Sequence, residues 1–141
     1  MSTILCSLNY LHIALIAAVG FFLGGLWYSV LFGKAWMAEM KLTPEECKAK
    51  GKSMGRLVMV KCFLLTVVST TVLACLIVDH GGNIGFRHGA CLGAFVGLGL
   101  VACRSAVNDM FQFKSFKHWL IVSGHDVVLL TLQGALLTHW R

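Results

Sequence analysis

The chain has 141 residues, of which 57% are hydrophobic and 13% are charged, and its mean hydropathy is +0.78. Soluble domains carry about 25% charged residues, so this composition excludes an ordinary soluble domain. The net charge is +6, but the sequence has no basic face interleaved with aromatic residues, so we expect no nucleic-acid partner. The composition predicts a single domain whose main partner is the lipid bilayer.

Four apolar segments are each long enough to cross a bilayer, which takes about 20 helical residues. They cover about residues 8–32, 57–78, 86–107 and 119–137. Backbone groups in lipid must be hydrogen-bonded within the chain, and these runs are too continuous for barrel strands, so we expect helices. The predicted fold is all-α: an integral membrane four-helix bundle, one domain over residues 1–141.

The first apolar segment does not resemble a signal peptide. No Lys or Arg precedes it, it is too long, and no small-residue cleavage site follows it, so we expect this helix to be retained. In the loop after it, Thr43 can cap a helix that has Pro44 in its first position and Glu46 three residues after the cap. This pattern predicts a short cytoplasmic helix from about Pro44 to Lys50, ending near Gly51. The short glycine-rich stretch 79–85 is expected to form a tight hairpin.

Basic residues predict the orientation of the helices. Ten of the twelve Lys and Arg residues lie in the first and third loops or at the adjoining helix ends: Lys34, Lys41, Lys48, Lys50, Lys52, Arg56, Lys61, Arg104, Lys114 and Lys117. The other two are Arg87 and Arg141. The positive-inside rule then places the first and third loops in the cytoplasm and both termini on the non-cytoplasmic side. We expect a multi-pass protein of a bacterial inner membrane.

Small residues recur at four-residue spacing in two of the helices. Gly20 and Gly24 lie in the first helix, and Gly89, Gly93 and Gly97 lie in the third. Such spacing lets membrane helices approach closely. The first and third helices run in the same direction, so a parallel contact between them would fit. The glycines are consistent with packing inside one bundle or with a homodimer seam.

Ionisable residues inside membrane spans are rare and usually functional. Every predicted helix places polar or aromatic groups in the cytoplasmic half of the bundle. These candidate residues are Trp27, Tyr28, Lys61, Arg104, Asn108, Asp109, His125 and Asp126.

One interpretation of this cluster is structural. Arg104 would pair with Asp126 or Asp109, Lys61 would extend its amine to the interface, and His125 would make one interhelical hydrogen bond. The protein would then be a non-catalytic accessory or assembly subunit of a membrane complex.

The other interpretation is a pocket that binds or transports a small molecule or ion, or relays protons. Arg104 and Asp126 would form an ion pair, and Trp27 and Tyr28 would line the pocket. His125 would titrate, because imidazole changes charge near neutral pH. Asp126→Asn distinguishes the two: it abolishes activity with near-normal folding in a transporter, but lowers stability or assembly in a structural subunit.

Other chemistry has little support in the sequence. The six cysteines form no metal-like spacing, so we expect buried packing residues and no metal site. Four histidines map to the outer face at irregular spacing, where interfacial exposure is expected: His12, His80, His88 and His139. His12 and His125 lie at different depths, which argues against haem. We expect no cofactor and no catalytic residue, because Ser123, His125 and Asp126 share one helical turn and cannot converge as a triad.

One region resembles a known family. It consists of Trp27-Tyr28-Ser29, Phe32-Gly33-Lys34, Trp36 and Leu42-Thr43-Pro44-Glu45-Glu46. These residues resemble the domain of unknown function 1761 family, small four-helix membrane proteins in which a Trp-Tyr-Ser-Pro run closes the first helix. Here Val30 replaces the proline. Gly124 and the closing apolar run to Trp140 also resemble the family. The resemblance implies the fold and topology but no activity.

Overall fold

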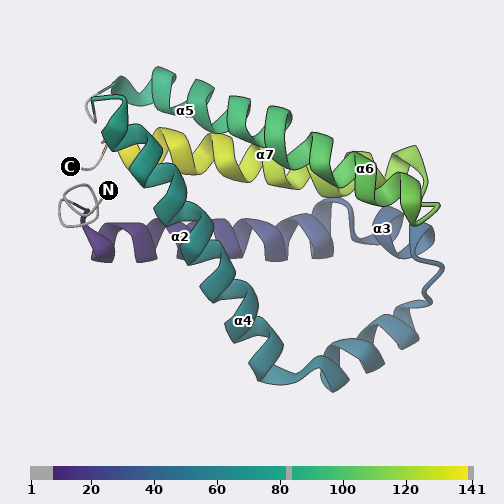
Figure 1. Cartoon of the computed structure of the whole chain (residues 1–141). Coiled ribbons are helices and arrows are strands. Elements are labelled where there is room, and N and C mark those ends of the chain that lie inside the picture. Colours follow the sequence, from purple (N-terminus) through teal and green to yellow (C-terminus); the bar gives the residue numbers. More distant parts are fainter. Residues whose placement is uncertain (1–7, 82–83, 140–141) are drawn as a thin grey trace.

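The computed structural model describes residues 8–81 and 84–139. Over these ranges every regular element is a helix (Figure 1). In chain order they are α2 (Tyr10–Leu26), the π-helix η1 (Trp27–Leu31), α3 (Gly33–Glu39), α4 (Pro44–Asp79), α5 (Gly85–Val96), the π-helix η2 (Gly97–Ala102), α6 (Cys103–Phe111) and α7 (Phe116–His139).

Four helical stretches are long and apolar enough to span a membrane: Tyr10–Leu31, Gly55–Asp79, Gly85–Phe111 and Phe116–Thr138. This confirms the predicted all-α membrane bundle. The third stretch ends later than expected and the fourth begins earlier, because α6 and α7 both continue into the connection between them. The start of α2, the end of α4, the start of α5 and the end of α7 lie at one end of the bundle; α3 and the α6–α7 connection lie at the other (Figure 1).

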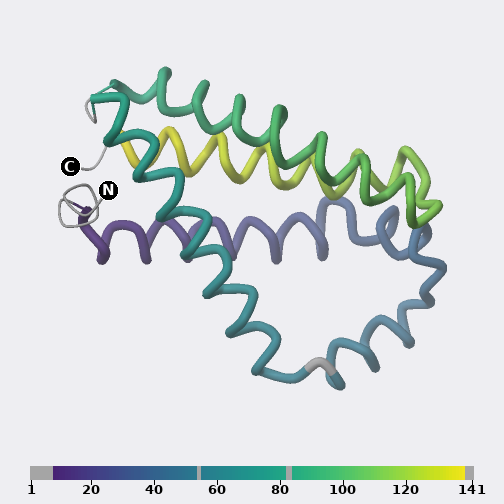
Figure 2. Tube along the Cα trace, viewed as in Figure 1, coloured from purple at the N-terminus to yellow at the C-terminus, as the bar shows by residue number. Residues whose placement is uncertain are grey.

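Helix α7 lies between α5 and α2, and α4 crosses them obliquely (Figures 1 and 2). The core is formed where α2, α4 and α7 meet, from the buried side chains of Ile13, Ile16, Leu73, Ala74, Ile77, Leu130 and Leu137. The first turns of the α4 span lie apart from the other helices (Figure 2), and their large apolar side chains, such as Leu57 and Val60, are exposed. In a bilayer this exposed surface faces lipid.

The close approach of α5 to α7 depends on glycine. A Cβ added at Gly89 would collide with the Gly134 carbonyl oxygen, and one added at Gly134 would collide with the Gly89 carbonyl. At Gly93 an added Cβ would lie 2.7 Å from the Leu130 carbonyl carbon, and at Gly97 it would lie 3.0 Å from Val127 Cα. These helices therefore touch backbone to backbone.

The glycines of the first helix also face α7. An added Cβ at Gly20 would lie 2.8 Å from Gln133 Nε2, and one at Gly24 would lie 3.2 Å from His125 Nε2. The glycines of α2 and those of α5 and η2 thus contact α7 and not each other. All five predicted packing glycines have neighbours within 4 Å in their own chain.

The predicted capping box begins α4. The Glu46 amide donates to Thr43 Oγ1 at 3.2 Å, and the Thr43 amide donates to Glu46 Oε2 at 2.8 Å. The predicted end near Gly51 is wrong, because helical geometry continues to Gly55, where φ is 68° and ψ is 171°. A glycine inside a helix costs only about 1 kcal/mol, so Gly51 does not end it. Gly55 adopts a backbone conformation that residues with a Cβ rarely reach.

Candidate functional site

A histidine and an aspartate next to each other on α7 form the centre of the candidate site. His125 Nδ1 lies 2.9 Å from Asp126 Oδ1. The His125 side chain is 12% exposed and that of Asp126 is 32% exposed. The contact is made within one helix, so it does not join two helices.

Two aromatic rings from η1 contact the imidazole. The ring centroids of Trp27 and Tyr28 lie 5.9 Å and 5.2 Å from that of His125. Trp27 is held in place because its Nε1 donates to the Ile121 carbonyl of α7 at 3.0 Å. The π-helical turn closes with the Phe32 amide bonded to the Trp27 carbonyl at 2.8 Å. Such wide turns are frequent at functional sites, and here one directs two consecutive aromatic residues at the same histidine.

The second imidazole nitrogen is enclosed by the helices. His125 Nε2 is buried and has no hydrogen-bond partner among the residues that the structure describes. Gly24 provides the space for it, since a Cβ there would lie 3.2 Å from this atom. When Nδ1 donates to Asp126, a neutral imidazole leaves Nε2 as an acceptor. In that tautomer the enclosed nitrogen is an acceptor with no donor from the described residues.

Asp126 also lines a cavity of about 410 Å³ between α4, the third helix and α7. The other lining residues are Ser69, Val72, Leu73, Leu76, Val96, Val101, Leu129 and Leu130. Asp126 is the single charged residue of this lining, and apart from Ser69 the remaining walls are apolar. The Asp126 carboxylate thus contacts the imidazole of His125 and also lines an apolar space at the level of the membrane span.

The structure brings together four of the eight predicted residues, Trp27, Tyr28, His125 and Asp126. Arg104, Lys61 and Asn108 are exposed instead. The predicted Arg104–Asp126 pair does not form: Asp126 contacts His125, and Arg104 has no ion pair within residues 8–81 and 84–139. The π-helix η2 precedes Arg104, and an extra residue in a turn rotates the following residues by about 100° relative to a continuous α-helix.

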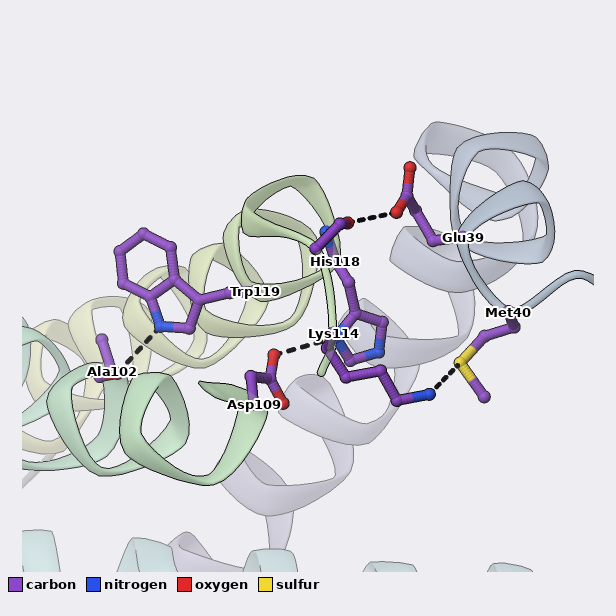
Figure 3. Close-up of polar contacts among 8 residues, drawn as sticks. Glu39, Met40, Ala102, Asp109, Lys114, His118 and Trp119 are labelled. Atoms are coloured by element: carbon purple, nitrogen blue, oxygen red, sulfur yellow. Dashed lines mark hydrogen bonds and ion pairs between the residues drawn. The ribbon is translucent and has the colours of Figure 1, made fainter. Parts of the chain in front are cut away.

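A second polar cluster lies at the α3 and α6–α7 end (Figure 3). Of its members, Asp109 is predicted from the sequence, whereas Glu39, Ser115, Lys117 and His118 are not. His118 Nδ1 lies 2.9 Å from Asp109 Oδ2, and Lys117 Nζ lies 3.7 Å from Glu39 Oε1. Ser115 caps α7 by accepting from the His118 amide at 3.0 Å, and it also donates to Glu39 Oε2. The spacing of Ser115 and His118 is a capping signal in the sequence, whereas the basic residues there predict only the topology.

The histidines and cysteines differ in part from expectation. His12 is 8% exposed and lies against the core, so the predicted interfacial exposure is wrong for it, whereas His80 and His88 are exposed. The side chain of His139 lies outside the described part of the structure. Cys62, Cys91 and Cys103 are exposed on the apolar surface and are not buried packing residues. Among the described residues no three His, Cys, Asp or Glu side chains form a group that could hold a metal ion.

Comparison with known proteins adds the family. Neither a curated protein nor a solved structure matched the chain. A family model described as "Protein of unknown function (DUF1761)" matches residues 11–138, which is nearly the whole chain. The match covers all four candidate spans except the first residue, Tyr10, and agrees with the resemblance carried by the region from Trp27 to Glu46. The chain therefore belongs to the DUF1761 family.

Proposed function

We propose that the protein binds a small apolar organic cation inside the membrane, with Asp126 as its counter-charge. The observation that carries this proposal is the carboxylate at the wall of an apolar cavity of about 410 Å³. Pockets for small molecules are mostly apolar, with a few polar groups, and range over about 300–1,000 Å³. A carboxylate inside a membrane span is costly unless a proton or a cation neutralises it. A cationic ligand with apolar substituents satisfies both the charge and the walls.

His125 gives this site a second state. The Nδ1 atom of His125 contacts Oδ1 of Asp126, while Oδ2 has no hydrogen bond to any described residue. With a protonated imidazole, Asp126 is neutralised from within the protein, and a bound cation can take over that role. Trp27 and Tyr28 hold the imidazole and do not line the cavity. The site can therefore exchange a proton for a cation, which is the chemistry that a coupled carrier requires.

The alternative proposal is an accessory or assembly subunit in which the same residues hold helices together. The contact of Asp126 argues against this role for the candidate site, because it stays within α7. A hydrogen bond between buried side chains of two helices is found elsewhere: Gln133 Nε2 donates to Thr70 Oγ1 at 2.9 Å. Asp126→Asn is therefore expected to leave folding near normal.

Binding of tetraphenylphosphonium to the purified protein in lipid nanodiscs tests the proposal. Tetraphenylborate has the same shape and the opposite charge, so it serves as the ligand control. We expect the cation to bind, the anion not to bind, and Asp126→Asn to weaken cation binding at least tenfold. Asp109→Asn removes a carboxylate that lies outside the cavity and is the matched protein control. Equal binding of cation and anion, or unchanged binding by Asp126→Asn, would refute the proposal.

Flux measurements in proteoliposomes separate binding from transport. Cation uptake driven by an outward proton gradient, and lost in Asp126→Asn, would support a carrier. Saturable binding without flux would restrict the function to binding.

A further inference from the structure

A second pocket lies where α6 ends and α7 begins. Its volume is about 300 Å³, and its lining includes Ala106, Asp109, Met110, Lys114, Phe116 and Trp119. It shares no lining residue with the cavity at Asp126. It combines one cation, one anion and an apolar wall, so its chemistry differs from that of the first site.

The pocket is at the depth of lipid headgroups. The third candidate span ends at Phe111 and the fourth begins at Phe116, so the connection between them crosses the membrane–water interface. Phe111, Phe113 and Phe116 are exposed in this connection, with Phe113 at 96%. Aromatic and basic residues gather at this depth in membrane proteins. A phospholipid headgroup is therefore the ligand that is present at the pocket opening at the highest concentration.

Lys114 supplies an available positive charge. Its Nζ has one hydrogen bond, to the thioether sulfur of Met40 at 3.6 Å, and no ion pair within the described ranges (Figure 3). A thioether is a weak acceptor, and an ammonium group has three donors. Phosphate oxygens are far stronger acceptors for these donors, because the hydrogen bonds are then charge-assisted.

Asp109 supplies a fixed negative charge in the same lining. Its Oδ2 is held by His118 at 2.9 Å, its side chain is 13% exposed, and Oδ1 has no hydrogen bond to a described residue. The pocket thus offers a donor group and an acceptor group together. A purely anionic headgroup would meet the carboxylate at a cost, because like charges repel.

Trp119 and Phe116 form the apolar wall. Trp119 Nε1 donates to the Ala102 carbonyl at 2.9 Å, which fixes the indole ring against the third helix (Figure 3). The two ring centroids lie 5.1 Å apart at 36°. Such a wall suits the glycerol and first acyl carbons of a lipid better than it suits a free ion.

We propose that this pocket binds a phospholipid whose zwitterionic headgroup ends in a primary amine, as in phosphatidylethanolamine. The phosphate lies on Lys114 and the ammonium donates to Asp109 Oδ1. Phosphatidylcholine has the same charges but its trimethylammonium group has no N–H to donate. Phosphatidylglycerol lacks the cation altogether. The two charged residues therefore select the lipid by different parts of its headgroup.

Native mass spectrometry of the protein released from nanodiscs tests this selection. The nanodiscs contain phosphatidylcholine with equal minor fractions of phosphatidylethanolamine and phosphatidylglycerol. We expect at least a fivefold enrichment of phosphatidylethanolamine on the wild-type protein. Lys114→Gln is expected to abolish the enrichment, whereas Lys61→Gln, which removes an exposed lysine on α4, is expected to retain it.

The role of Asp109 is tested by which phospholipid the protein retains and not by the total amount of lipid that it retains. Asp109→Asn is expected to lose the preference for phosphatidylethanolamine over phosphatidylcholine while still retaining phospholipid through Lys114. His118→Ala removes the other partner of Asp109 but keeps the carboxylate, so it is expected to keep the preference, which separates lipid recognition from local folding. Retention of phosphatidylglycerol in preference, or unchanged selectivity in Asp109→Asn, would overturn the proposal.

Competition by soluble phosphoethanolamine shows whether the pocket binds the headgroup of a membrane lipid or a free phosphate compound. We expect it to displace the lipid only weakly, because it makes no contact with the aromatic wall. Displacement at micromolar concentration would instead assign the pocket to a free phosphate metabolite and overturn the lipid assignment. Asp126→Asn is expected to keep the lipid selectivity, so this proposal and the cation site can fail separately.

Discussion

Replacement of Gly93 by alanine tests the backbone contact between α5 and α7. The new Cβ would collide with the Leu130 carbonyl oxygen and would lie 2.7 Å from its carbonyl carbon and 3.1 Å from Thr131 Cα. All three atoms belong to the backbone, so no side-chain rotation relieves the collision. Bringing the carbonyl carbon alone to the 3.4 Å at which ordinary contact begins requires the helices to separate by at least about 0.7 Å, the difference between the two distances, and the nearer carbonyl oxygen requires more.

A gap of 0.5–1 Å loses about a quarter to a half of the dispersion energy of each contact, and overpacking typically costs about 1–3 kcal/mol. Because alanine has a higher helix propensity than glycine, the substitution offsets up to about 1 kcal/mol of this cost. We therefore expect Gly93→Ala to lower the free energy of unfolding by about 2 kcal/mol. Gly99 lies in the same spanning helix with no atom within 4 Å of an added Cβ, so Gly99→Ala is expected to be neutral or stabilising.

Unfolding by sodium dodecyl sulfate in mixed micelles, followed by circular dichroism and tryptophan fluorescence, measures both variants. Both variants replace glycine by alanine in the same spanning helix. The informative quantity is therefore which of the two has the lower free energy of unfolding. If Gly93→Ala unfolds at the same detergent fraction as wild type, or Gly99→Ala is equally destabilised, the close backbone contact is not what stabilises the pair.

Three further predictions concern other parts of the chain. Gln133→Ala is expected to lower the free energy of unfolding by about 2 kcal/mol, since it removes a buried interhelical hydrogen bond and leaves a cavity; detergent unfolding measures this. Gly24→Ala is expected to push on the imidazole of the candidate site and weaken tetraphenylphosphonium binding severalfold, whereas Gly25→Ala, with open space at its Cβ, is expected to leave binding unchanged. Hydrogen bonds from the Thr43 backbone and side chain lower the pKa of Glu46. The capping box therefore contributes stability above the pKa of an unfolded glutamate, about 4.3, and loses it as the pH falls through the lower folded value. The protection factor of the Thr43 amide, which corrects the exchange rate for its intrinsic pH dependence, should fall on acidification, and Glu46→Gln should remove that fall.

The fold could be predicted because apolar length and capping chemistry act locally. The four spans follow from continuous apolar runs, and the start of α4 follows from Thr43, Pro44 and Glu46. The break at Gly55 could not be predicted in the same way. Gly51 and Gly55 are equivalent as sequence signals, and the route of the chain between α3 and the bundle determines which of them takes a positive φ.

The candidate site was predictable only where neighbours in sequence remain neighbours in space. His125 and Asp126 share a turn, and Trp27 and Tyr28 lie at the matching depth of the first helix, so depth alone placed these four together. The partner of Arg104 depends on helix rotation, which depth does not determine. Asp109 shows the same limit, because it pairs with His118 across the α6–α7 connection.

Both π-helical turns flank the same stretch of α7. From η1, Trp27 bonds to the Ile121 carbonyl and Tyr28 contacts His125. In η2, Gly97 approaches Val127 and Val101 lines the cavity beside Asp126. A continuous α-helix has better backbone hydrogen bonds, so packing alone gives no reason for two such turns at one level. Wide turns of this kind are frequent at functional sites, and both lie beside the stretch of α7 that carries the proposed cation site, which is what a bundle shaped for binding and not only for stability would show.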